Sequence, residues 1–153
     1  MLHQFEVIEL APQATVSYRG TCTHDQIGVE LMRLLPRAWE TAQKSGLQPI
    51  GPPYCRYLDW RESDCDIEGG VFVDGAASAD LNGVCGSLGG CRALHTRHTG
   101  PYTDLHIAHA EAREYAANHG LTFGGPPWEH YLTDPEEEPD ASNWITDIYW
   151  PLT

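Results

Sequence analysis

The sequence is poor in basic residues. Nine Lys and Arg stand against 22 Asp and Glu among 153 residues, which gives a formal net charge of -13. Proteins bind nucleic acids largely by neutralising phosphates with Lys and Arg, so this balance argues against a nucleic-acid partner. It also opposes adsorption to an anionic membrane surface. We therefore expect no direct contact with nucleic acid or membrane.

Long apolar runs are missing as well. No segment approaches the roughly 20 apolar residues that a membrane-spanning helix needs. The first ten residues, MLHQFEVIEL, carry acids and lack the basic start and apolar stretch of a signal peptide. We therefore expect a cytoplasmic protein.

Cysteine pairing is another feature that the sequence lacks. The five cysteines are odd in number and form no CxxC pair, which predicts neither a disulfide scaffold nor a four-thiolate zinc site. We expect reduced thiols, with a Cys85–Cys91 disulfide as the remaining alternative.

The common catalytic and metal-binding motifs are absent too. No GxSxG, GxxxxGK[ST] or HExxH motif occurs. His95 and His98 would point to opposite faces of a strand. His106 and His109 are spaced to share a helix face, but no third ligand is spaced to complete a metal site. We predict neither a metal nor a cofactor.

What the sequence does contain is an internal repeat. Residues 46–58 (GLQPIGPPYCRYL) and 120–132 (GLTFGGPPWEHYL) are identical at seven of thirteen positions at a constant offset of 74. An eighth position pairs two aromatic residues, Tyr54 and Trp128. This density of identities indicates a duplicated unit.

Each copy follows a segment with helical spacing of apolar residues. The first segment spans 24–46, with a capping box predicted at Thr23 and Gln26 and a stop at Gly46. Pro36 inside it predicts a kink. The second segment is predicted to begin at a Thr103 cap and to end at Gly120. Runs typical of β-strands flank these segments at 14–20, 65–73, 92–100 and 144–152.

Each half is therefore predicted to contain a strand, a helix and two further strands, in that order. Two such units that share a core predict an α+β fold: an antiparallel sheet with two main helices, its halves related by a pseudo-twofold axis. We expect a single domain over residues 1–153, with repeats at about 5–74 and 90–153. The glycine-rich segment from about 75 to 90 would be a linker with one short strand.

The two copies differ most at Glu129, which replaces Cys55 of the first copy. Because side chains alternate along a strand, Glu129 and Tyr131 should share one face, while Trp128 and His130 point to the other. Two alternatives remain open for Glu129. It is either an exposed strand residue beside an aromatic core or a carboxylate that faces a ligand.

In the second alternative, aromatic residues gather around the carboxylate. The repeat makes Tyr57 the counterpart of Tyr131, the strand at 144–150 can add Tyr149, and the first helix can add Trp39. Such a carboxylate can pair with a cation or act as a general acid or base. The resulting ligand-binding candidates are Trp39, Tyr54, Tyr57, Glu129, Tyr131 and Tyr149.

Four segments in order carry a resemblance to a known family: RGT (19–21), HTGPY (98–102), GGPPWEHYLTDP (124–135) and WITDIYWPL (144–152). Over essentially the whole chain, the sequence resembles the GyrI-like small-molecule-binding domain. This module forms the effector-binding half of multidrug-sensing regulators of the MerR and AraC types.

The resemblance implies two strand–helix–strand–strand units with an aromatic-lined ligand cleft between them. It implies that the family's acid, which recognises lipophilic cations, is Glu129, and that Tyr57 and Tyr131 are the best-matched aromatics. The regulators also carry a helix-turn-helix region, for which this chain has no room. The resemblance therefore implies a free-standing effector-type domain.

We expect a small-molecule-binding protein for aromatic, often cationic, compounds, in drug or xenobiotic sensing or protection. The alternative is a hydrolase of strained electrophiles such as cyclopropane-bearing DNA-alkylating natural products, an activity of some stand-alone relatives. Glu129 and Tyr131 would then be catalytic, with Tyr57 as the alternative to Tyr131. A third possibility, which the family name suggests, is a protein partner such as gyrase or a regulator.

Overall fold

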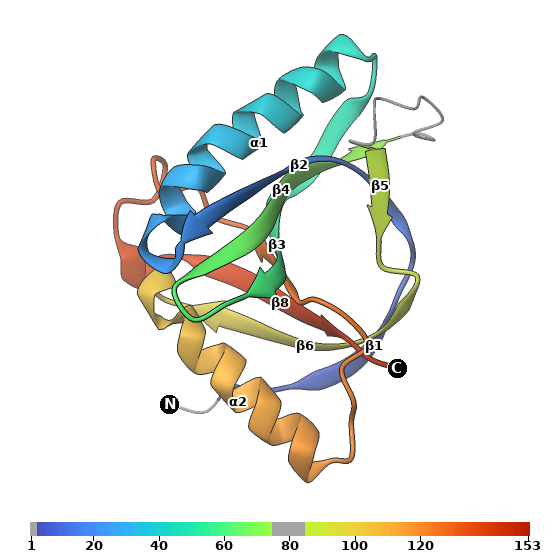
Figure 1. Cartoon of the computed structure of the whole chain (residues 1–153), viewed down its shortest axis with the longest axis vertical. Coiled ribbons are helices and arrows are strands. Elements are labelled where there is room, and N and C mark those ends of the chain that lie inside the picture. The colour runs from blue at the N-terminus through green and yellow to red at the C-terminus, as the bar shows by residue number, and fades with distance from the viewer. Residues whose placement is uncertain (1–2, 75–84) are drawn as a thin grey trace. The chain divides into compact units, whose positions relative to one another are not determined.

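The predicted fold class is confirmed: the chain is α+β, with antiparallel strand pairing and two main helices (Figure 1). A computed structural model describes residues 3–74 and 85–153. The chain divides into two units. Unit 1 is Met1–Leu10 together with Cys91–Thr153, and unit 2 is Ala11–Gly90.

Unit 2 is a four-stranded antiparallel sheet with one main helix. Its strand order is β3-β4-β2-β5. The helix α1 packs against β2, β4 and β3. Its elements are β2 (Gln13–Thr23), η1 (His24–Gln26), α1 (Ile27–Lys44), β3 (Gln48–Trp60), β4 (Asp64–Asp74) and β5 (Cys85–Leu88).

Unit 1 has the same construction. Its strand order is β1-β6-β8-β7, all antiparallel. Its elements are β1 (Glu6–Leu10), β6 (Cys91–Thr99), η2 (Tyr102–Asp104), α2 (Leu105–Asn118), β7 (Trp128–Tyr131), η3 (Ala141–Asn143) and β8 (Ile145–Pro151).

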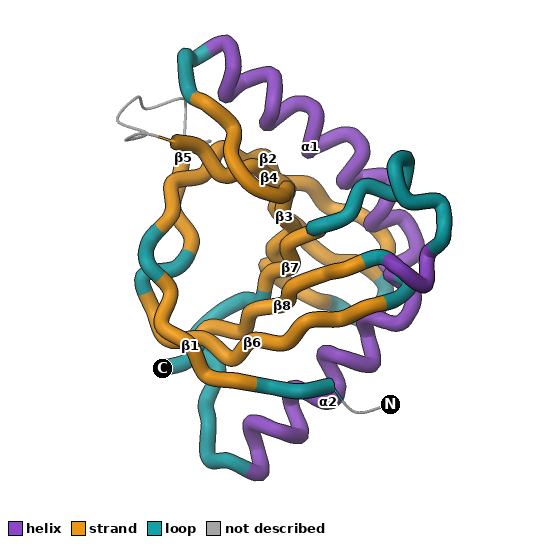
Figure 2. The backbone as a smooth tube through the Cα atoms, turned by 180° about the vertical axis from the view of Figure 1, so that it is seen from behind, coloured by secondary structure: helices purple, strands orange, loops and turns teal. Residues whose placement is uncertain are grey.

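Each unit contains a short strand that is distant in sequence from the strand with which it pairs. In both units the strand before the helix is paired with a short strand from the other half of the chain (Figure 2): β1 pairs with β6, and β5 pairs with β2. The short strand expected within 75–90 is β5, whereas the rest of that expected linker, 75–84, lies outside the described residues. The pairing of β1 has no counterpart in the sequence prediction.

Both helices bury the same repeat positions. The buried residues are Leu31, Leu34, Ala38 and Ala42 in α1, and Leu105, Ala108, Ala112 and Ala116 in α2. Each residue of the first set lies 74 positions before its counterpart, the offset of the repeat. The spacing of three and four residues gives each helix one apolar stripe that faces its sheet. The duplication therefore extends to the packing of the helices.

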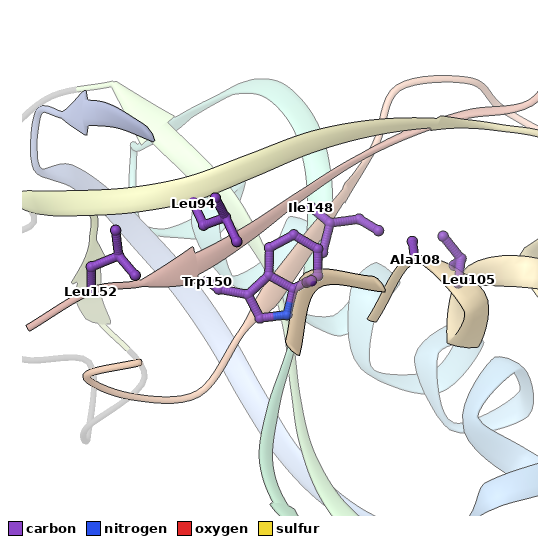
Figure 3. Close-up of a cluster of buried hydrophobic side chains, with 7 residues drawn as sticks. Leu94, Leu105, Ala108, Ile148, Trp150 and Leu152 are labelled. Carbon is purple, nitrogen blue, oxygen red and sulfur yellow. The ribbon is translucent and has the colours of Figure 1, made fainter. Parts of the chain in front are cut away.

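In unit 1 the stripe of α2 meets the sheet through large side chains (Figure 3). Ile148 and Trp150 of β8 lie against Leu105 and Ala108, and Leu94 of β6 completes the contact. In unit 2, α1 lies close to Gly69 of β4. A Cβ atom added to Gly69 would lie 3.0 Å from the Cβ of Leu34, so a side chain here would require the neighbouring atoms to shift.

The helix ends were predicted correctly and the helix starts were not. Gly46 and Gly120 have φ angles of 74° and 66°, the left-handed conformation that stops a helix. Neither Thr23 nor Thr103 caps a helix, because each α-helix is preceded by a 3-10 turn. The hydroxyl of Thr23 instead donates to Asp25. Pro36 lies inside α1.

Of the described helices, none is long and apolar enough to span a membrane.

Leu34→Ala tests the stripe of α1. Leu34 is fully buried, so the truncation should lower the free energy of unfolding by about 2–5 kcal/mol. Met32→Ala is the matched control in the same helix, because 71% of Met32 is exposed and its loss should change little. Urea denaturation of both variants measures this, and similar effects in the two would contradict the packing described.

Candidate functional site

Glu129 lies on the side of the unit 1 sheet that α2 covers. Only 1% of the residue is exposed, so the expectation of an exposed strand residue is wrong. The predicted alternation along β7 is confirmed. The Tyr131 hydroxyl donates to Glu129 Oε1 at 2.8 Å, and on the other face the Trp128 indole N–H donates to His130 Nε2 at 3.0 Å.

The second carboxylate oxygen of Glu129 is bound to the helix. His109 Nε2 of α2 lies 2.7 Å from Glu129 Oε2, and Trp150 Nε1 of β8 donates to His109 Nδ1 at 3.2 Å. An indole N–H can only donate, so His109 Nδ1 is the acceptor and Nε2 carries the hydrogen. Both carboxylate oxygens therefore accept a hydrogen bond from a side chain.

Aromatic rings surround this network. The Tyr102 ring meets the Tyr131 ring edge-on at 5.4 Å between centroids and lies 4.6 Å from the Trp144 ring. The His109 and Trp150 rings are 5.2 Å apart, also edge to face. Burial, and to a lesser extent the charges of Asp134 and Glu129, raise the pKa of Tyr102, so this hydroxyl remains a hydrogen-bond donor at neutral pH.

The opposite face of the same sheet carries a separate charged cluster. Asp147 of β8 is 6% exposed and accepts two hydrogen bonds from Arg97, at 2.8 and 2.9 Å, while His95 Nε2 lies 3.2 Å away. Burial alone would raise the pKa of Asp147, but the Arg97 and His95 contacts outweigh burial and lower it. Asp147 is therefore a paired structural anion.

Tyr149 belongs to that opposite face. It pairs with Trp128 in the β7–β8 register, whereas Ile148 lies across from Glu129. Its ring stacks on Trp128 at 5.7 Å and contacts His130 and His95. The expectation that Tyr149 shares the space of Glu129 is thus not met, because the register turns it away.

The other predicted ligand residues lie in unit 2. Tyr54 is fully buried and donates to Glu68 at 2.8 Å. Tyr57 is half-buried, with its ring 5.9 Å from Trp60, and Trp39 is 46% exposed on α1. Within unit 1, the structure brings Glu129 and Tyr131 of the predicted set into contact.

Three residues of the network were not predicted: Tyr102, His109 and Trp150. His109 follows Leu105 by four positions and precedes Ala112 by three, so helical spacing could have placed it on the sheet-facing side. Trp150 could have been found only with the β7–β8 register in hand. Tyr102 lies within the HTGPY segment, but the three-residue helix η2 is too short for residue spacing to predict where its side chain lies.

No group of three or more His, Cys, Asp or Glu in residues 3–74 and 85–153 is arranged to hold a metal ion. His109 is bound to Glu129 and His106 to the Thr103 carbonyl. All five cysteines, including Cys85 and Cys91, are free thiols.

The chain belongs to the GyrI-like small molecule binding domain family, whose sequence profile matches residues 3–153. A search of curated proteins by sequence finds no match. The fold is shared with solved structures of low sequence identity, which establish the architecture alone.

The C-terminal domain of EcmrR is 21% identical with a TM-score of 0.85, and the match covers 100% of this chain and 99% of that one. SAV2435, solved bound to tetraphenylphosphonium, is 14% identical with a TM-score of 0.62 and coverage of 100% and 94%. A hydrolase from Listeria innocua is 15% identical, with a TM-score of 0.64 and coverage of 99% and 93%.

The partly buried His130 generates a prediction about acid stability. Burial lowers the pKa of His130 to about 4, whereas an unfolded histidine titrates near 6.5. Between these values the unfolded chain binds a proton that the native state does not, so stability falls as the pH drops from about 6.5 to about 4. His130→Gln should remove up to about 3 kcal/mol of that fall.

Urea denaturation at several pH values measures the effect. Leu132→Ala, an exposed position just beyond β7, is the control that should keep the wild-type pH dependence. An unchanged slope in His130→Gln would show that other groups cause the acid dependence.

Proposed function

We propose that the protein binds lipophilic aromatic cations at Glu129, on the helix-facing side of unit 1. The observation that carries this proposal is the burial of a carboxylate, 1% exposed, whose Oε1 accepts a hydrogen bond from Tyr131, a half-buried tyrosine that lies beside further aromatic rings. Burial of a carboxylate is costly, and a cation that binds close to it offsets part of that cost.

The rings beside Glu129 support an aromatic ligand. Ring faces attract cations through their quadrupole, and Tyr102, Tyr131 and Trp144 form a continuous group of such rings. Tyr102 and Tyr131 are only half-buried, so they are the surface that a ligand reaches first, with Glu129 behind them. The net charge of -13 favours the approach of cations.

Membership of a small-molecule-binding family supports the ligand class, and the tetraphenylphosphonium bound to SAV2435 suggests the first probe. The biological role that follows is sensing or sequestering of xenobiotic cations.

Hydrolysis is the second candidate. The Tyr131 hydroxyl and the Glu129 carboxylate, 2.8 Å apart, are an acid–base pair that could act on water and a strained electrophile. The Listeria innocua hydrolase of the same fold makes this test worthwhile. Mass spectrometry of bound compounds separates the two functions, because a hydrolase returns the compound with one water added only when Glu129 is present.

Glu129→Gln tests the binding proposal. The amide keeps the shape and loses the charge, so tetraphenylphosphonium should bind at least about tenfold more weakly, a loss of about 1.4 kcal/mol or more. Triphenylphosphine oxide, a neutral compound with similar rings, should be affected much less. Isothermal titration calorimetry measures both affinities, and circular dichroism checks that the variant is folded.

The matched control is Glu114→Gln, which removes one exposed carboxylate from α2. It removes one negative charge, as Glu129→Gln does, and should leave the affinity for the cation nearly unchanged. Equal affinity of wild type and Glu129→Gln for tetraphenylphosphonium would overturn the proposal, whereas equal losses in both variants would indicate long-range attraction alone.

A further inference from the structure

Thr146 of β8 is a fully buried residue whose hydroxyl makes no hydrogen bond within the described chain. Its exposed fraction is 0%, and its Oγ1 has no partner among residues 3–74 and 85–153. The large majority of buried side-chain polar atoms are hydrogen-bonded, and a buried hydroxyl without a partner costs free energy. Such a group points to a partner that comes from outside the chain.

The strand register places Thr146 beside the candidate site. Thr146 lies directly opposite Tyr131 of β7, and Ile148, two residues further along β8, lies opposite Glu129. Because side chains alternate along a strand, Thr146 and Ile148 share the face that α2 covers. Residues diagonal to one another in an antiparallel pair are about 7–8 Å apart, so Thr146 is a close neighbour of Glu129.

Aromatic rings lie around this hydroxyl. Trp144 precedes Thr146 by two residues in extended backbone, and its ring centroid lies 4.6 Å from that of Tyr102. Tyr102 also meets the ring of Tyr131 at 5.4 Å between centroids. Thr146 therefore lies at the base of the ring group formed by Tyr102, Tyr131 and Trp144.

The polar neighbour of Thr146 on the other adjacent strand is already bonded. His98 of β6 lies opposite Thr146 in the β6–β8 register. One ring nitrogen of His98 is hydrogen-bonded to His3, and the other to the carbonyl of Pro101. Neither nitrogen serves the threonine hydroxyl.

The other unit shows that the fold does not need a hydroxyl at this position. Tyr57, the repeat counterpart of Tyr131, lies opposite Ile67 of β4. Ile67 is therefore the counterpart of Thr146, and it is also fully buried. Because an apolar side chain fills this position in unit 2, packing alone does not explain the hydroxyl of Thr146.

We propose that Thr146 hydrogen-bonds the ligand of the Glu129 site, which makes the site favour aromatic cations that carry a hydroxyl or amino group over those that carry none. The inference rests on the proposed function and adds to it the class of ligand and the residue that selects it. A ligand reaches Thr146 when the half-buried ring of Tyr102 turns aside. The hydrogen bonds of Glu129 with Tyr131 and His109 do not involve Tyr102, so they stay in place.

Two valine variants test whether the hydroxyl is unbonded in the free protein. Valine has the shape of threonine without the hydroxyl, so Thr146→Val should melt at the wild-type temperature or above it. Thr96→Val is the matched control, because Thr96 is also buried in this sheet and its hydroxyl donates to the Gln4 carbonyl at 2.6 Å. This control should melt at a lower temperature. A clear fall in the melting temperature of Thr146→Val, followed by circular dichroism, would show an existing partner and overturn the inference.

The selectivity is tested with tetraphenylphosphonium and its 2-, 3- and 4-hydroxyphenyl analogues, which add one hydroxyl to the same cation. In calorimetry, at least one analogue should bind wild type about three- to tenfold more tightly than the parent, the worth of one hydrogen bond. The ratio of the two affinities should fall to about one in Thr146→Val and be retained in Thr146→Ser. The absence of any gain in wild type, or an unchanged gain in Thr146→Val, would overturn the inference.

Glu129→Gln separates a failure of this inference from a failure of the proposed function. It should weaken the binding of the parent cation and of its analogues alike. Cation binding that does not depend on Glu129 would refute the proposed function. Binding that depends on Glu129 but shows no preference for the added hydroxyl would refute the role of Thr146 alone.

Discussion

A carboxylate removed from water must have its lone pairs satisfied, and this requirement determines how the elements of unit 1 meet. The Glu129 carboxylate is hydrogen-bonded to Tyr131 of its own strand and to His109 of α2. His109 is in turn hydrogen-bonded to Trp150 of β8. Removing one partner of a buried charge costs several kcal/mol because the charge remains without compensation. The network therefore joins α2, β7 and β8 through directed hydrogen bonds, in addition to the apolar contacts of α2.

The two units show how duplication separates structural from functional positions. On the sheet face away from the helices, both units keep a buried acid across from an arginine: Glu68 opposite Arg19, and Asp147 opposite Arg97. The two acids occupy matching registers, since Glu68 pairs with Arg56 and Asp147 with His130. The helix-facing positions have instead diverged, with Cys55 in one unit and Glu129 in the other. A feature kept in both copies serves the fold, and the feature present in one copy is where a specialised role can arise.

This division also explains which features could be predicted from the sequence. Strand alternation places Glu129 with Tyr131 on purely local grounds, and helical spacing with terminal glycines defines both helices. The relation of β7 to β8 is not local, and a shift of one residue in register turns every side chain to the other face. Tyr149 was therefore assigned to the wrong face and Trp150 was overlooked. The pairing of β1 with β6 and of β5 with β2 could not be predicted either, because the sequence of a short strand does not identify the strand with which it pairs.

The hydrogen bonds to both oxygens of the Glu129 carboxylate bear on whether the site binds a compound or turns it over. A general base needs a free lone pair within reach of the proton it removes, and each hydrogen bond donated to a carboxylate stabilises its ionised form and weakens it as a base. With Tyr131 bonded to one oxygen and His109 to the other, both oxygens of Glu129 already take part in hydrogen bonds. Catalysis would require the Tyr131 hydroxyl to turn from the carboxylate toward a substrate oxygen, freeing Oε1 for water. A cation bound against the half-buried rings of Tyr102 and Tyr131 would leave these hydrogen bonds in place, so capture asks for less rearrangement of the site than catalysis does.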